Sequence, residues 1–215
     1  MDITPTKRTT INRIAEKAVF DRDHINSILD EGFIAHIAWV DEAGQPYVIP
    51  TGYARDGDRI LFHGSTGAGM FRALAAGSPA CATITLLDGM VLARSAFESS
   101  MHYRSVVILG TCEVLEGDEK SAALDVMTDH FLPERRPTLR PMLKKEIAAT
   151  LVLSLPLTEV SAKVSNGQPT DEDDDINFPV WAGTVPMKTV FGTPVPADNL
   201  AAENSQVPDY ISRWK

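Results

Sequence analysis

The most informative part of the sequence is Leu61-Phe-His-Gly-Ser-Thr-Gly-Ala-Gly-Met-Phe-Arg72, in which an apolar run leads through a glycine-rich turn into apolar residues at helical spacing. This pattern predicts a strand that ends at His63, a short loop and a helix. Glycines allow close approach to a ligand, and the N-terminus of a helix beside hydroxyl groups and Arg72 favours an anion. The stretch therefore indicates a phosphate-binding loop.

A flexible turn with an exposed arginine is the simpler alternative, because short Gly-Ser-Thr loops are common. The stretch is not a P-loop, since it lacks the Gly-Lys-Ser/Thr ending. It is not a dinucleotide fingerprint either, because that motif needs a parallel βαβ unit.

The rest of the chain consists mainly of runs rich in β-branched and aromatic residues, punctuated by turn signals such as Asp56-Gly57 and Asp88-Gly89. Strands are expected over residues 33–40, 46–54, 59–63, 79–93, 103–115 and 151–164, and helices over 21–32, 118–132 and 138–150. Asp21 and Asp23 are both candidate N-caps for the first helix. We expect a mainly β (α+β) domain over residues 1–190, closed as a barrel of five or six antiparallel strands with flanking helices, and a C-terminal tail over 191–215.

The net charge of −9 and the pI near 5.0 argue against a nucleic-acid-binding protein, which needs a basic face. No apolar stretch reaches the ~20 residues that a bilayer span requires, and charged residues interrupt the first thirty positions where a secretory signal would lie. A cytoplasmic protein without a membrane partner is expected. Cys81 and Cys112 lie in strand-like runs and are expected to be buried thiols, while the acidic run 171–175 is expected to form a solvated loop.

Two further stretches carry candidate binding residues. The run from Ser99 to Ser105 brings hydroxyl, imidazole, phenol and guanidinium groups to the start of an apolar strand, and Trp181 precedes small residues that leave its ring accessible. His24, His36 and His130 show no metal-ligand spacing, and no metal is expected. No hydrolase nucleophile motif is present, and no catalytic residue is assigned.

Several motifs in order resemble the FMN-binding split-barrel proteins related to pyridoxamine 5'-phosphate oxidase, in the branch that includes nitroimidazole-resistance proteins. They are Arg8-x-x-x-x-Arg13, Gly-Gln-Pro-Tyr-Val-Ile-Pro-Thr (44–51), Leu-Phe-His-Gly-Ser (61–65), Ser-x-x-Tyr-Arg-Ser-Val-Val (100–107) and Trp-Ala-Gly-x-Val-Pro (181–186). The resemblance implies a six-stranded antiparallel split β-barrel, a homodimer and one FMN at each of two sites across the dimer interface.

The resemblance also implies roles for individual residues. Pro50 and Thr51 would line the flavin ring, while His63, Gly64, Ser65, Thr66 and Arg72 would hold the ribityl phosphate. The second subunit would contribute Tyr103, Arg104 and Ser105, and Trp181 would close the edge of the ring. The chain ends Asp209-Tyr-Ile-Ser-Arg-Trp-Lys215, which does not match the basic substrate motif of the oxidases proper, so pyridoxal phosphate synthesis is not implied.

The expected function is that of an FMN-dependent oxidoreductase acting on a small aromatic or nitro compound, with NAD(P)H as a candidate electron donor. A bound flavin performs the electron transfer itself, so the absence of an acid/base pair in the sequence does not argue against an enzyme. The alternatives are a non-catalytic flavin-binding protein for storage or redox sensing, and a split barrel that binds haem or a deazaflavin instead. The substrate, and the roles of the acidic loop and the tail, stay open at this stage.

Overall fold

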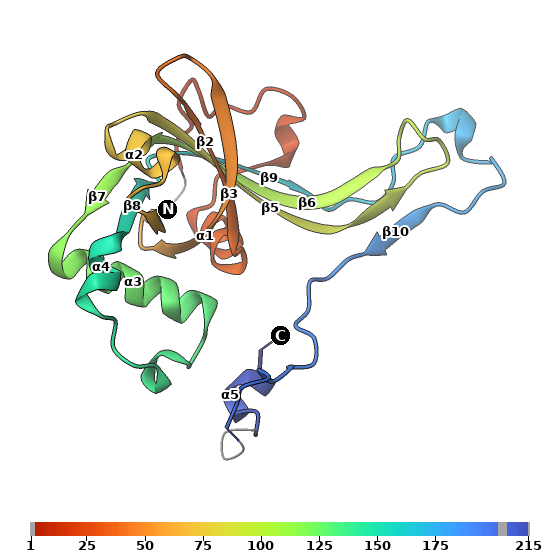
Figure 1. Cartoon of the computed structure of the whole chain (residues 1–215). Helices are drawn as coiled ribbons and strands as arrows, with labels where there is room; N and C mark the ends of the chain where they lie inside the picture. The colour runs from red at the N-terminus through yellow and green to blue at the C-terminus, as the bar shows by residue number, and fades with distance from the viewer. Residues whose placement is uncertain (1–2, 202–205, 215) are drawn as a thin grey trace.

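The computed structural model describes residues 3–201 and 206–214, which are organised around one antiparallel sheet with short helices beside it (Figure 1). The α-helices are α1 (Arg22–Glu31), α2 (Gly69–Ala75), α3 (Gly117–Phe131), α4 (Lys144–Ala149) and α5 (Asp209–Ser212). The strands are β1 (Ala18–Val19), β2 (Ile34–Val40), β3 (Pro46–Asp56), β4 (Arg59–Ser65), β5 (Pro79–Leu92), β6 (Ser100–Thr111), β7 (Glu113–Leu115), β8 (Thr150–Pro156), β9 (Glu159–Ser165) and β10 (Gly183–Pro186). Three short 3-10 helices lie at η1 (Ala15–Lys17), η2 (Arg136–Thr138) and η3 (Asp173–Asp175).

The predicted class, a mainly antiparallel split barrel with flanking helices, is confirmed, but the number of strands is wrong. The described sheet has ten strands in the order β1-β9-β6-β5-β2-β3-β4-β8-β7, and β10 pairs with β5. The apolar run 151–164 divides at Leu157 and Thr158 into two strands that pair with different partners. The run expected over 103–115 likewise divides at Cys112 into β6 and β7, which pair with β9 and β8. The remaining additions, β1 and β10, have two and four residues, too few for a detectable alternation of apolar and polar residues.

Helix α1 begins where the sequence predicts, and the structure decides between its two candidate caps. The side chain of Asp21 accepts a hydrogen bond of 2.7 Å from the backbone N–H of His24, so Asp21 is the N-cap and Asp23 lies in the first turn. The helix predicted over 138–150 is shorter than expected. It covers only α4, because Pro141 disfavours regular helix over residues 138–141.

Strand β4 separates two groups of buried apolar residues. Phe62 belongs to the larger core, which also contains Ile28 and Leu29 of α1, whereas the neighbouring Leu61 belongs to the smaller core, which contains residues of α3. Successive strand residues point to opposite faces, so one strand supplies both cores. Cys112 is buried and Cys81 is half-buried, and both are free thiols as expected.

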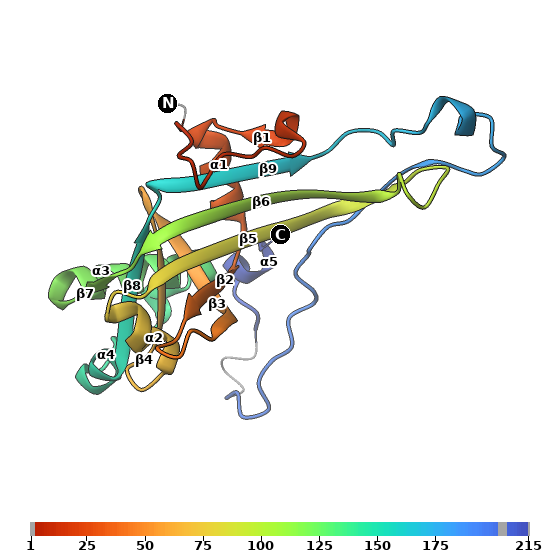
Figure 2. The ribbon, with the colours of Figure 1, turned by 90° about the horizontal axis from the view of Figure 1, so that it is seen from above.

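Strands β5 and β6 continue past the barrel as a long two-stranded ribbon, which β10 joins near its far end (Figure 2). The pairing of β5 with β6 slips by one residue at Asp88, between Leu87 and Gly89. A side chain at Gly89 would lie only 2.8 Å from the carbonyl oxygen of Val185, so glycine is required for β10 to pack here.

The acidic run 171–175 is not a wholly solvated loop as predicted. Asp171 is only 5% exposed at its side chain, and it accepts hydrogen bonds from the backbone N–H of Arg94 and from its Nη1, at 2.6 and 2.7 Å. Asp173–Asp175 form η3. This ion pair joins the tip of the ribbon to the segment that leads into β10.

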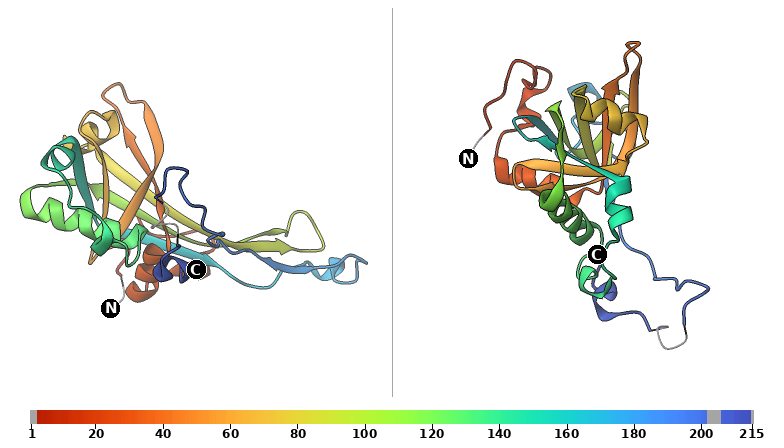
Figure 3. Two further views of the ribbon diagram at one scale, coloured as in Figure 1. Left: turned by 60° about the horizontal axis from the view of Figure 1, so that its bottom comes forward. Right: turned by 60° about the vertical axis from the view of Figure 1, so that its left-hand side comes forward.

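After β10 the chain returns along the barrel, and α5 docks against the loop that follows α3 (Figure 3). Arg135 donates to the phenol oxygen of Tyr210 at 3.1 Å, and the indole N–H of Trp214 donates to the carbonyl of Pro133 at 3.3 Å. The boundary expected near residue 190 stays a prediction. Within residues 3–201 and 206–214, no helix is long and apolar enough to cross a membrane, and no group of His, Cys, Asp and Glu side chains is arranged to hold a metal ion.

Candidate functional site

The centre of the candidate site is a split between β3 and β4. The two strands pair only from Tyr53–Phe62 to Asp56–Arg59, after which β3 follows β2 and β4 follows β8. Pro50 and Thr51 lie on the diverging part of β3, and Gly64 and Ser65 lie on the diverging part of β4. The structure therefore places the expected ring-binding residues and the start of the expected phosphate loop on the two strands that flank this split.

Close packing requires a glycine at position 64. A Cβ atom at this position would lie 2.3 Å from the ring of Phe71, which is itself buried in the larger core. Gly67 and Gly69 have room for a side chain. At Gly64 the atom group that approaches the backbone closely is thus the ring of Phe71. No such neighbour lies close to Gly67 or Gly69, so the surface of the loop at these two residues is not covered by other atoms of the chain.

The loop from Ser65 to Ala68 is ordered by its own hydrogen bonds. The backbone N–H of Thr66 donates to Ala149, that of Gly67 to the Ser65 hydroxyl, and that of Ala68 to the Ser65 carbonyl, at 3.0 to 3.2 Å. Its remaining donors are the exposed hydroxyl groups and the first amides of α2, for which the described residues provide no acceptor. Because α2 has only seven residues, its terminus adds little to anion binding.

Arg72 extends from α2 toward the β2–β3 hairpin. It lines a groove of about 700 Å³ together with Trp39, Asp41 and Tyr47, among others. Its guanidinium makes no hydrogen bond or ion pair to any residue that the structure describes, whereas Arg55, Arg59 and Arg104 are each paired with carboxylates. Arg72 is therefore available to a ligand.

His63 lies on the other side of the loop. It contributes to a pocket of about 250 Å³ whose walls come from α3, α4 and the start of β8, including Met127, Phe131 and Ile147. Desolvation by these walls lowers the pKa of the His63 imidazole below its ordinary value of 6.5, although the residue keeps contact with solvent. The imidazole is therefore neutral at pH 7 and can donate or accept a hydrogen bond.

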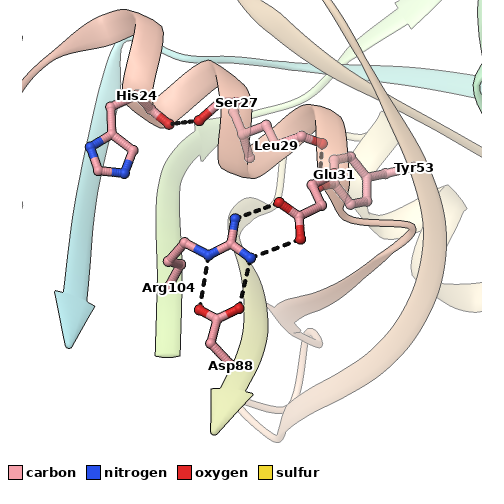
Figure 4. Close-up of polar contacts among 7 residues, drawn as sticks. All are labelled: His24, Ser27, Leu29, Glu31, Tyr53, Asp88 and Arg104. Atoms are coloured by element: carbon pink, nitrogen blue, oxygen red, sulfur yellow. Dashed lines mark hydrogen bonds and ion pairs between the residues drawn. The ribbon is translucent and has the colours of Figure 1, made fainter. Parts of the chain in front are cut away.

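Arg104 is already occupied within the chain (Figure 4). Nε and Nη2 donate to the two carboxylate oxygens of Asp88 at 2.9 and 2.7 Å, while Nη2 and Nη1 donate to those of Glu31. These hydrogen bonds raise the pKa of Arg104 above its already high ordinary value. They join β6 to the slip in β5 and to the end of α1, which indicates a structural role for this residue.

The remaining expected residues lie away from the loop within one chain. Tyr103 and Ser105 are half-buried on β6, which is separated from β4 by β5, β2 and β3. Trp181 is 65% exposed and lies over Gly183 at the start of β10. The proposal that these residues complete the site from a second subunit is compatible with this placement, and it stays a prediction.

The sequence reading missed Trp39 and Tyr47. They are directly opposite each other in the register of β2 and β3, and their rings stack with centroids 5.2 Å apart at 17°. The signal was available, since the two aromatic residues flank the turn 41–45 at equal distances from its ends.

Comparisons with known proteins agree with this architecture. Residues 21–164 match the family described as pyridoxamine 5'-phosphate oxidase. The FAD and heme binding protein from Mycobacterium smegmatis is 43% identical with a TM-score of 0.87, over 91% of this chain and 96% of that chain. The flavocytochrome Anf3 from Azotobacter vinelandii is 36% identical with a TM-score of 0.92, over 99% of both chains.

A protein from Bacteroides thetaiotaomicron described as a 5-nitroimidazole antibiotic resistance protein is 24% identical with a TM-score of 0.58, over 68% of this chain and 86% of that chain, and supports the fold alone. The comparison with curated proteins found no match.

Proposed function

The chain belongs to the pyridoxamine 5'-phosphate oxidase family of split-barrel proteins, and on this premise we propose that it binds a flavin nucleotide and uses it to oxidise or reduce a small aromatic or nitro compound. The observation that supports the proposal is the split between β3 and β4, which has Thr51 on one flanking strand and the loop 63–66 at the end of the other. When bound, a flavin supplies the electron transfer. The residues of the chain hold and orient it.

The donors at the opening suit a flavin 5'-phosphate. Ser65 and Thr66 present exposed hydroxyl groups at the end of β4, and Pro50 lies exposed on β3, across the split. Arg72 follows the loop on α2, where it lines the neighbouring groove and has no carboxylate partner among the described residues. The sequence resemblance implies FMN, while relatives of known structure are described as an FAD and heme binding protein and as a flavocytochrome. FMN and FAD share the phosphate for which this donor set is suited.

We further propose that the protein acts as a homodimer. Apolar side chains are exposed along β2, β3 and the ribbon, among them Ile34, Val48, Leu87 and Met101. Exposed apolar area of this kind is typical of a surface that another chain covers. The family resemblance implies that a second copy brings Tyr103, Arg104 and Ser105 to the flavin and that Trp181 closes the edge of the ring. In this chain Arg104 is held by Asp88 and Glu31.

Haem binding is the second candidate, and His36 favours it. His36 is exposed on β2 between its register partners Pro50 and Thr83, and Ile34 and Val48 lie exposed on the neighbouring rows. The rings of His102 and His130 are hydrogen-bonded to the carbonyls of Gly167 and Gly32, whereas the structure describes no such bond for His36. An imidazole on a mainly apolar surface can act as an axial ligand to haem iron.

The test of the proposed function separates these possibilities. The protein is purified, its visible spectrum is recorded, and the chromophore released on denaturation is identified by mass. We expect a flavin that NADH or NADPH reduces and that a nitroaromatic acceptor reoxidises over many turnovers. A bound flavin that no donor reduces would support the storage or sensing alternative and contradict the enzyme. An additional haem spectrum that His36→Ala abolishes would establish the second candidate.

A further inference from the structure

A groove of about 700 Å³ runs between α2 and the β2–β3 hairpin, beside the phosphate loop but on its opposite side from His63. We propose that this groove binds an adenosine phosphate, as the adenylate part of a dinucleotide. The inference rests on the proposed function, because the dinucleotide would be either the flavin itself, in its FAD form, or the nicotinamide donor that reduces it. Both sources present the same adenosine phosphate chemistry.

The groove exists because, apart from Arg72, the residues that line it from α2 and its C-terminal end are small. Gly69, Ala73 and Ala76 lie at positions i, i+4 and i+7 of the helix, so they share the face that is turned toward the hairpin. Larger residues there would fill the space against Trp39. The resulting volume lies within the ~300 to 1,000 Å³ usual for small-molecule sites.

An aromatic wall closes the opposite side. Trp39 is 7% exposed and stacks on Tyr47, which is 43% exposed, with the ring planes 17° apart. Purine bases stack on such rings because both partners present flat π surfaces. The rigid pairing of β2 with β3 fixes the two rings before any ligand arrives.

The charges around the groove suit the rest of an adenosine phosphate. Arg72 supplies the cation for the phosphate. Asp41 uses one carboxylate oxygen to accept from the backbone amides of Ala43 and Gln45, and its other oxygen and the exposed Glu42 can accept from ribose hydroxyl groups. Carboxylates in this position favour a free ribose and repel a 2'-phosphate.

The position of Arg72 links the two parts of a dinucleotide. Arg72 lies one helical turn beyond the loop that ends at Ala68, so it stands between the phosphate loop and the groove. A pyrophosphate would place one phosphate on each side of its guanidinium. Tyr47 and the expected ring-binding residue Thr51 lie four residues apart on the same face of β3, so the adenine and the flavin ring would lie along one face of this strand.

The test is calorimetric titration of ADP into the full-length protein in three forms: free of flavin, loaded with FMN and loaded with FAD. If the groove holds the adenylate of FAD, ADP binds the flavin-free form, binds the FMN-loaded form more weakly because its second phosphate competes with the FMN phosphate, and fails to bind the FAD-loaded form. If it holds the adenylate of a nicotinamide donor, ADP binds all three forms equally. Absence of ADP binding to all three forms overturns the proposal and leaves flavin binding intact. Binding of ADP by a protein that takes up neither FMN nor FAD supports the groove and overturns the flavin function.

Two pairs of variants test whether ADP binds in the groove. Tyr47→Ala should weaken ADP binding by about ten-fold or more, the loss expected when a base loses an aromatic stacking partner. Tyr210→Ala, the same change on α5, should leave it unaltered. Arg72→Gln should weaken ADP binding by a similar factor, while Arg136→Gln, at an exposed arginine paired with Asp125 and Asp129, should not. Circular dichroism confirms folding, and ADP binding by folded Tyr47→Ala and Arg72→Gln variants at wild-type strength contradicts the assignment.

Discussion

Arg104 on β6 holds Asp88 at the slip in β5 through two parallel hydrogen bonds of 2.9 and 2.7 Å. The backbone carbonyl of Asp88 also accepts from the N–H of Met187 at 2.8 Å, just beyond β10. One short segment of β5 thus joins the barrel, the ribbon and the chain that returns toward α5. Since Glu31 binds the same guanidinium from α1, the ion-pair cluster fixes where the ribbon leaves the barrel.

The first prediction is that Asp88→Asn destabilises the protein by about 1 to 2 kcal/mol. The substitution removes the negative charge that accepts two hydrogen bonds from Arg104, in an ion pair that is only partly exposed to solvent. Glu31→Gln should cost clearly less, since the Glu31 side chain is 56% exposed against 33% for Asp88. Urea unfolding of the two variants provides the comparison. Equal losses would mean that solvent exposure does not set the strength of these pairs.

Gly64→Ala is predicted to destabilise the protein by about 1 to 3 kcal/mol, because its methyl group would overlap the ring of Phe71. Gly67→Ala, in the same loop, meets no atom closer than 3.6 Å and should be nearly neutral. Thermal unfolding measures both variants. Adding Phe71→Leu should restore part of the loss at position 64, and a failure of this rescue would argue against the overlap as its cause.

Asp21→Ala should cost about 1 kcal/mol of folding free energy, because the backbone N–H of His24 loses its acceptor at the start of α1. Asp21→Asn keeps a side-chain oxygen at the same place and should unfold close to the wild type. Chemical denaturation of the two variants distinguishes the cap from a general effect of charge, which would make both variants equally unstable.

Much of this architecture follows from local patterns in the sequence, and the failures have specific physical causes. Long strands, the capped helix α1 and the loop before α2 were predictable because each carries a periodic pattern or a marked end. Strand β10 was not, because its four residues form a strand only by pairing with the far end of β5. The division between β8 and β9 was hidden in one apolar run, since both strands are largely buried.

The candidate site shows the same limit. Thr51 and Ser65 were identified from ordered motifs, and the fold brings their strands to one opening. The partners of Arg104 are distant in sequence, so no local pattern indicated that this side chain would be engaged by Asp88 and Glu31. Contacts between residues that are distant in the sequence are thus the part of the site that local sequence patterns do not predict.

Alkaline pH is predicted to weaken the fold. Burial raises the pKa of the Cys112 thiol from 9.0 to about 12, and burial together with the charge of Asp30 raises the pKa of the Tyr53 phenol. Both groups bind their protons more tightly in the folded protein, so their contribution is complete below about pH 9 and is lost as the pH rises above it. Between pH 9 and 10.5 the free energy of unfolding should fall by about 1 to 2 kcal/mol.

Cys112→Val provides the control for this titration. It removes the thiol while keeping a small apolar side chain in the core, and the decline between pH 9 and 10.5 should become smaller. Denaturant unfolding at a series of pH values measures the slope, and an unchanged slope in the variant would exclude Cys112 as its source.

The central claim is that the opening between β3 and β4 binds a flavin through its 5'-phosphate, and it is tested most directly by titrating flavin-free protein with FMN and with riboflavin. We expect FMN to bind at least ten-fold more tightly than riboflavin, and Arg72→Gln to weaken FMN binding by about ten- to a hundred-fold while leaving riboflavin binding almost unchanged. Equal affinities for the two ligands, or no binding of either, would contradict the claim.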